Sequence, residues 1–196
     1  TRVLESTSDG KNEMGTVTKG AAQDVYLPEN SADIIFTDPP YYDAVPYADL
    51  SDFFYVLLKR SLGDEYSELF DQELTQKKSE IVQLAERNKK YFYKTKEYFE
   101  EEMQKAMEKF RCILASRGLG VVVFAHKSTD GWEAMLSAVI NAGWTVTASW
   151  PIDTERAVRM RAQKSAALGS SIHLICRPRE NPNDSQQADE IGDWRD

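Results

Sequence analysis

The stretch Ser31–Tyr47, SADIIFTDPPYYDAVPY, decides the fold. The apolar, β-prone run Ile34–Phe36 is typical of a strand in a parallel sheet that is covered on both faces. Two consecutive prolines, Pro39 and Pro40, cannot continue a ladder of backbone hydrogen bonds, so we predict that the strand ends here. An acid, Asp38, and two tyrosines are left at its carboxyl end. Because ligands collect at the carboxyl ends of strands in open α/β sheets, this stretch predicts a site and not only a polar turn.

The segments around this stretch alternate between strand and helix patterns, which predicts a parallel α/β sheet. The last two strands have no credible helix between them, so we expect them to be antiparallel. The predicted strands are residues 15–22, 33–36, 119–127, 144–150 and 171–177, and the predicted helices are residues 48–63, 96–118 and 129–143.

Composition narrows the classes of protein. The 196 residues, 41% of them hydrophobic, fit one globular domain. A net charge of −8 argues against a broad nucleic-acid footprint over the whole chain. Neither a signal peptide nor a membrane-spanning apolar run is present, so we expect no membrane and a cytoplasmic location. Cys112 and Cys176 lie far apart in no metal-like spacing; we expect no metal and predict that both thiols are core residues.

The segment TDPPYYD, Thr37–Asp43, resembles the catalytic motif of amino-group methyltransferases, which methylate adenine N6 or cytosine N4 with S-adenosylmethionine. The wider run Leu27–Leu58 resembles the large prokaryotic adenine-specific DNA methylase family that carries an amino-terminal domain of unknown function. The resemblance covers about residues 15–177. It implies a class I methyltransferase (Rossmann-like) sheet that lacks its first two strands and ends in an antiparallel pair.

The physical reason for these residue types is the poor nucleophilicity of an exocyclic amine, whose lone pair is delocalised into the base. The Asp38 carboxylate and the Pro39 carbonyl, held by Pro40, are expected to accept its two N–H groups and free that lone pair. Tyr41 is expected to stack on the flipped base, and Tyr42 to line its pocket. Cytosine C5 chemistry is disfavoured, because neither cysteine is placed as a nucleophile.

Further base-pocket and nucleic-acid contacts are expected outside the motif core. Asp43 and Tyr47 follow the motif and could also line the base pocket, although packing under the next helix is the preferred interpretation for Tyr47. A local basic patch could contact DNA phosphates; it could equally be a solvated loop or pair with acidic residues. The residues of the patch that we assign to DNA are Arg156, Arg159 and Arg161.

The cofactor site is at best half present in the sequence, because no glycine-rich turn follows a first strand. We expect only Gly20, Ala21 and Thr37 to lie near S-adenosylmethionine. The chain does not begin with Met, which favours a carboxyl-terminal part of a longer polypeptide over a degenerate relative. We therefore predict that the chain alone binds the cofactor weakly and is inactive.

The expected organisation is a polar leader (1–14), a partial catalytic domain (15–178) with a helical insertion (59–97), and a polar tail (179–196). DNA, S-adenosylmethionine and the rest of a longer polypeptide are the implied partners, and an oligomer is left open. Two alternatives to adenine N6 methylation of DNA remain. One is a cytosine-N4 or RNA amino-group methyltransferase, and the other is a non-catalytic, methyltransferase-derived interaction domain.

Other residues have two interpretations each. His126 and Lys127 are expected to end a strand on the same edge as Asp38, where they could line the cleft or, for His126, form local hydrogen bonds. The aromatic and lysine-rich segment Tyr91–Phe99 could stack on bases, but helix packing is the preferred interpretation.

Overall fold

The computed structural model describes residues 15–16, 18–43, 45–152 and 171–179. The predicted leader and almost all of the predicted tail lie outside this part. The described elements are η1 (Ala22–Asp24), β1 (Ala32–Thr37), α2 (Tyr47–Leu62), η2 (Lys89–Tyr91), α3 (Lys96–Ile113), β2 (Leu114–Phe124), α4 (Thr129–Asn141), β3 (Trp144–Ile152) and β4 (Ser171–Pro178).

The described strands form one mixed sheet in the order β1-β2-β4-β3. β1 runs parallel to β2, with Phe36 opposite Val121. β4 lies between β2 and β3 and is antiparallel to both. The prediction of an α/β sheet with an antiparallel terminal pair is confirmed. Because β1 and β2 are parallel, their carboxyl ends lie at the same edge of the sheet.

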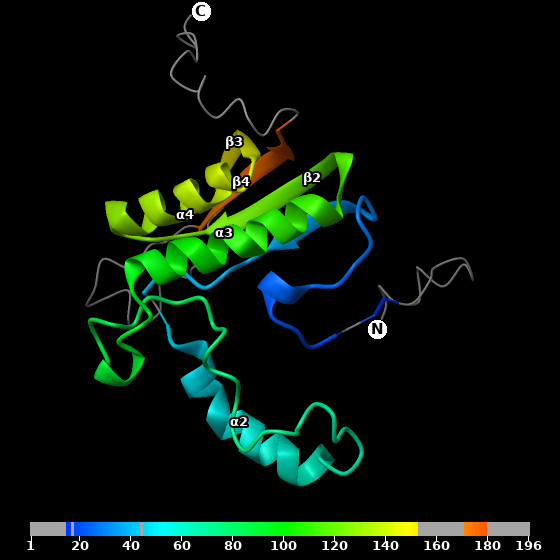
Figure 1. The fold of residues 1–196 in the computed structure, drawn as a ribbon, viewed down its shortest axis with the longest axis vertical. Helices are drawn as coiled ribbons and strands as arrows, with labels where there is room; N and C mark the ends of the chain where they lie inside the picture. The colour runs from blue at the N-terminus through cyan, green and yellow to red at the C-terminus, as the bar shows by residue number, and fades with distance from the viewer. Residues whose placement is uncertain (1–14, 17, 44, 153–170, 180–196) are drawn as a thin grey trace, which may run out of the picture.

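Helices α3 and α4 cover one face of this sheet (Figure 1). The buried side of α3 follows helical spacing, with Phe99, Met103, Ala106 and Met107 one or two turns apart. Thr95 caps its amino end, where the side chain accepts a hydrogen bond from the amide of Tyr98. These residues meet the inward-facing residues of β2 and β4, and together they form the main core.

Three elements differ from the predictions. The helix predicted for residues 96–118 ends at Ile113, and residues 114–118 form the start of β2. The described residues of the segment 15–22 form no strand up to Ala21; they are mostly exposed and pair with no neighbouring strand. The expected helical insertion is also wrong, because only η2 is helical between Gly63 and Thr95. This segment is weakly amphipathic, so a helix there would bury little apolar surface. It forms a loop with its own small core of Val82, Leu84 and Tyr91.

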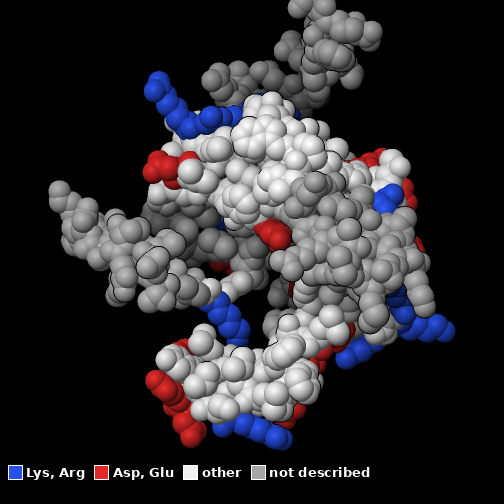
Figure 2. All heavy atoms as spheres, turned by 180° about the vertical axis from the view of Figure 1, so that it is seen from behind, with Lys and Arg blue, Asp and Glu red and all other residues white. Residues whose placement is uncertain are grey.

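The second face of β1 and the apolar side of α2 are exposed. Ile34 and Phe36, which point away from α3, are 64% and 62% exposed, and α2 has no buried residue. The view from behind shows the lobe of α2 and its following loop as largely uncharged surface edged by acidic and basic side chains (Figure 2). None of the helices in the described ranges combines the length and hydropathy needed to cross a membrane.

Candidate active site at the carboxyl end of β1

A cavity of about 490 Å³ lies where the chain passes from β1 into α2. It is lined by the motif residues Asp38, Pro39, Pro40 and Tyr41, by Tyr47 at the start of α2, and by Glu80. The Asp38 side chain is exposed, and within the described part of the chain no group hydrogen-bonds to it. The structure therefore brings the four expected catalytic residues to one hollow and leaves the Asp38 carboxylate available to a ligand.

The ring of Tyr41 is held from the neighbouring strand. It packs edge-on against Phe124, the fully buried last residue of β2, with ring centroids 5.4 Å apart. Edge-to-face packing of this kind orients an aromatic ring while leaving other parts of it accessible. Because Tyr41 also lines the cavity, it has the position that a stacking platform for a planar ligand needs.

The structure places Tyr42 in the core and not in the cavity, in contrast to the expected base contact. Its backbone adopts a left-handed conformation with φ of 52°. This turn directs the ring inward, where it packs edge-on against Phe99 at 5.2 Å and His126 at 5.4 Å. The backbone carbonyl of Tyr42 accepts a hydrogen bond of 3.0 Å from the amide of Gln83. Tyr42 thus anchors the turn that carries the motif.

Asp43 is also engaged structurally. One carboxylate oxygen lies 2.8 Å from His126 Nε2, and the other accepts a hydrogen bond of 2.7 Å from Arg87 Nη2. The Ser128 amide donates to His126 Nδ1 at 3.2 Å, which assigns the proton of a neutral ring to Nε2 and makes it the donor to Asp43. Because both oxygens are taken by the protein, Asp43 fastens the motif turn to β2 instead of lining the base pocket.

The outcomes for the flanking residues are mixed. His126 follows β2 at the same sheet edge as Asp38, as predicted, and its role is local hydrogen bonding. Tyr47 lines the cavity, so its predicted packing under α2 is wrong. Glu80 is a cavity residue that the sequence did not indicate, because it belongs to the charged segment interpreted as a helical insertion and no spacing distinguishes it.

The residues expected near the cofactor do not line this cavity. Gly20 is exposed, and a Cβ built on it would meet no atom within 4 Å. Ala21 is half-buried and precedes η1. Thr37 is the last residue of β1 and lies opposite Val122, directly before Asp38. The expected DNA contacts Arg156, Arg159 and Arg161 lie outside the described residues.

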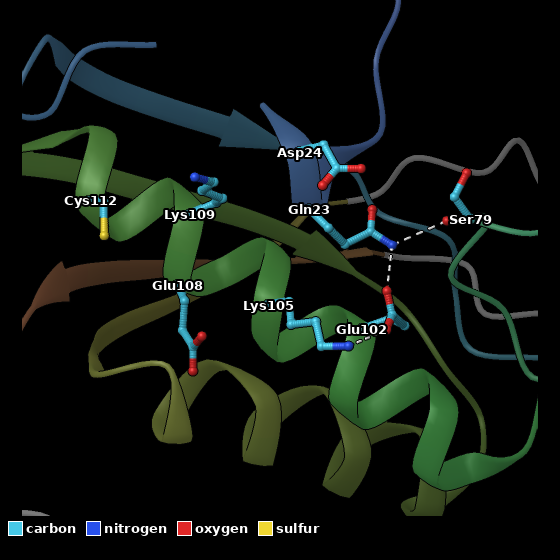
Figure 3. Close-up of a pocket in the computed structure, with 8 residues that line it drawn as sticks. All are labelled: Gln23, Asp24, Ser79, Glu102, Lys105, Glu108, Lys109 and Cys112. Atoms are coloured by element: carbon cyan, nitrogen blue, oxygen red, sulfur yellow. Dashed lines mark hydrogen bonds and ion pairs between the residues drawn. The ribbon is translucent and has the colours of Figure 1, made fainter. Parts of the chain in front are cut away.

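A second cavity of about 520 Å³ lies between η1, the loop and the outer side of α3 (Figure 3). Within it, Glu102 accepts hydrogen bonds from Gln23 at 2.9 Å and from Lys105 at 2.6 Å. Cys112 also lines this cavity and is exposed, so the prediction of a core thiol is wrong for Cys112. It is confirmed for Cys176, which is buried.

No protein-family model matches the chain, and no curated protein sequence matches it. Among solved structures, the chain is similar to a candidate DNA modification methylase from Thermus thermophilus. The two are 13% identical, the TM-score is 0.43, and the overlap covers 83% of this chain and 52% of the other. The chain thus spans about half the length of that structure. A likeness at this identity and TM-score assigns neither a family nor an activity.

Proposed function

We propose that the chain is the catalytic part of an S-adenosylmethionine-dependent DNA methyltransferase that modifies the exocyclic amine of a flipped base, with adenine N6 as the preferred target. The observation that carries this proposal is the Asp38–Tyr41 turn at the carboxyl end of β1. It lines a cavity with an exposed carboxylate and an aromatic ring braced by Phe124.

The charge of the cavity supports an amine as the substrate group. Among the described residues that line it, Asp38 and Glu80 carry carboxylates and none is a lysine or arginine. Glu80 is paired with Lys94, so Asp38 is the carboxylate that has no ionic partner within the described part of the chain. An unpaired carboxylate in the lining favours hydrogen-bond donors and disfavours phosphate or carboxylate groups. The exocyclic amine of a base offers two donors. Asp38 and the Pro39 carbonyl would accept one each, which increases the nucleophilicity of the nitrogen, while Tyr41 stacks on the ring.

Gly20 and Ala21, which are expected near the methyl donor, do not line the cavity that contains Asp38. We propose that residues 15–178 form a partial catalytic domain, that Thr37 lies at the border of the donor site, and that a longer polypeptide supplies the rest. No role in methyl-donor binding is assigned to the second cavity, where Glu102 is occupied by Gln23 and Lys105.

The decisive experiment measures methyl transfer from labelled S-adenosylmethionine by a longer protein that contains this chain, with DNA and RNA as substrates. Asp38→Ala should lower the rate by about 10²–10³-fold, the cost of removing one preorganised electrostatic group. Asp33→Ala is the matched control, because Asp33 is an exposed acid of β1 outside the cavity. Unchanged activity of the Asp38 variant would refute the proposed role, and analysis of the modified nucleosides distinguishes adenine N6, cytosine N4 and RNA products.

The separation of Gly20 and Ala21 from the Asp38 cavity favours one second candidate, a non-catalytic interaction domain derived from a methyltransferase. This candidate predicts nucleic-acid or protein binding by the longer protein without methyl transfer. It also predicts that Asp38→Ala leaves that binding unchanged, because the acid would then have no substrate amine to activate.

A further inference from the structure

We infer that the loop Ser79–Thr95 positions the candidate active site, and that the buried pair Lys94–Glu80 is the element that holds it in place. The loop contacts the carboxyl-terminal end of the motif. Its Gln83 amide donates to the Tyr42 carbonyl at 3.0 Å, and its Arg87 pairs with Asp43 at 2.7 Å. The link to catalysis rests on the proposed function, whereas the positioning itself does not.

Lys94 is a buried charge with a complete set of partners. Its side chain is 0% exposed. The ammonium donates to the Glu80 carbonyl at 2.9 Å, lies 3.4 Å from Glu80 Oε2, and is 5.4 Å from the centroid of the Tyr91 ring. Burial lowers the pKa of Lys94, and the Glu80 carboxylate opposes that shift. A buried ammonium is costly unless it is paired, so Lys94 strongly disfavours any position of Glu80 outside this contact.

Glu80 also contacts the first turn of α2, so the pair with Lys94 fixes the position of that turn. Its other oxygen, Oε1, accepts a hydrogen bond of 2.9 Å from the Ala48 amide. First-turn amides of a helix lack partners within the helix, and Pro46 at the cap position provides no side-chain acceptor. Glu80, a residue of the loop, therefore caps the helix, because no side chain at the cap position can do so. Tyr91 adds a second tie to the same turn, because its hydroxyl donates to Asp49 at 2.7 Å.

The first turn of α2, which Glu80 caps, forms one wall of the cavity. Tyr47, the first residue of α2, lines the cavity together with Glu80 and faces the same space as Asp38. Segment 75–77 also holds the start of α2, because the Thr75 hydroxyl donates to the Ala48 carbonyl at 2.6 Å and Lys77 pairs with Asp52 at 2.8 Å. Of these contacts, only the one through Glu80 connects the helix to Lys94 by an ion pair. Lys94 is thus a positioning residue: through Glu80 it sets the distance between the wall at Tyr47 and the Asp38 carboxylate, without touching a substrate itself.

The test compares Lys94→Met with Lys96→Met in the full chain by amide hydrogen exchange. Both changes remove one lysine charge, but Lys96 is part of an exposed group of ion pairs with Glu100 and Glu133. In the Lys94 variant the Ala48 and Asp49 amides should exchange at least roughly tenfold faster, as expected for loss of a charge-assisted hydrogen bond. Amides of β2 and α4 should change little, and the Lys96 variant should leave the α2 amides unchanged.

Glu80→Gln provides a second, milder variant in case Lys94→Met fails to fold. It keeps an acceptor for the Ala48 amide and removes the ionic attraction to Lys94, so faster exchange should again be confined to the first turn of α2. The double variant Lys94→Met/Glu80→Gln should be more stable than Lys94→Met, because it leaves no buried carboxylate without a counter-ion.

Faster exchange spread evenly over the sheet and helices, or α2 amides that do not respond, would overturn the inference. In the methyl-transfer assay of the longer protein, a positioning role predicts a lower kcat with a smaller change in KM for Lys94→Met. If that protein transfers no methyl group, the proposed function fails, and the exchange result still decides whether Lys94 positions the cavity wall.

Discussion

Gly131 lies in the first turn of α4, and replacing it with alanine should destabilise the protein although alanine is the better helix former. A Cβ at this position would lie 2.5 Å from His126 Cγ and still closer to Nδ1. The imidazole cannot simply rotate away, because it stacks on Phe124 and packs edge-on against Tyr42. The ring must therefore shift by roughly an ångström, which strains or breaks its hydrogen bond to Asp43.

The magnitude follows from two opposing effects. Gly→Ala in a helix contributes up to about 1 kcal/mol of stability. Overpacking costs about 1–3 kcal/mol, and the loss of a buried hydrogen bond costs about 1 kcal/mol more. The net effect of Gly131→Ala is a loss of about 2 kcal/mol, which lowers Tm by roughly 4–8 °C for a chain of this length.

Thermal and denaturant unfolding measure this difference directly. Gly20→Ala is the matched control, because a Cβ there meets no atom within 4 Å; its stability should stay within about 0.5 kcal/mol of the parent. In a His126→Ala background the clash is gone, so Gly131→Ala should become neutral or stabilising. A Gly131→Ala variant as stable as the parent protein would refute the argument that the His126 ring is held in a fixed position.

Three predictions concern titratable groups. Burial raises the pKa of the Cys176 thiol to about 11, so a thiol reagent at about pH 8 should label only the exposed Cys112 in the folded chain and both thiols after unfolding. The hydrogen bond from Lys77 lowers the pKa of Asp52 from 3.8 to about 2; it stabilises the folded chain above the unfolded pKa, and the contribution is lost as pH falls through about 2. Asp52→Asn should flatten acid unfolding monitored by circular dichroism over that range. Burial raises the pKa of Tyr98 from 10.0 to about 12, so its neutral form stabilises the fold below pH 10.0 and the contribution is lost as pH rises through about 12; Tyr98→Phe should remove that alkaline dependence.

Each of these has a contrary result. Two rapidly labelled thiols in the folded chain would contradict the burial of Cys176. Identical acid transitions for the parent and the Asp52 variant would show that the Lys77 pair contributes nothing to folding. An unchanged alkaline transition in the Tyr98 variant would show that this phenol titrates as it does in the unfolded chain.

The sequence was sufficient to predict the strand at Ile34–Phe36, its end at the prolines, and the antiparallel pairing of the last two strands of the chain. These features depend on local signals: apolar runs, residues that break strands, and the absence of a helix between the last two strands. The expected catalytic residues Asp38 and Tyr41 share one cavity because a strand end fixes them together.

The rest could not be predicted because it depends on contacts between distant residues. Lys94 looks like a surface lysine in the sequence, and its burial depends on Glu80, which lies on another part of the loop. Tyr42 resembles its neighbour Tyr41 chemically, yet a positive φ sends its ring into the core. The segment interpreted as a helix packs on the motif turn and on α2. Such contacts leave no helical periodicity in the sequence.

The pairing of β1 with β2 also has a consequence for how the chain folds. Residues 38–113 separate the two strands, whereas α3, β2 and α4 follow one another closely. Closing a loop of that length must precede the parallel pairing, so this contact forms slowly and late. During synthesis β1 is made before β2. Until β2 follows, Ile34 and Phe36 have no neighbouring strand to pair with. The strand that leads into the candidate active site is therefore the one most exposed to misassembly before the fold is complete.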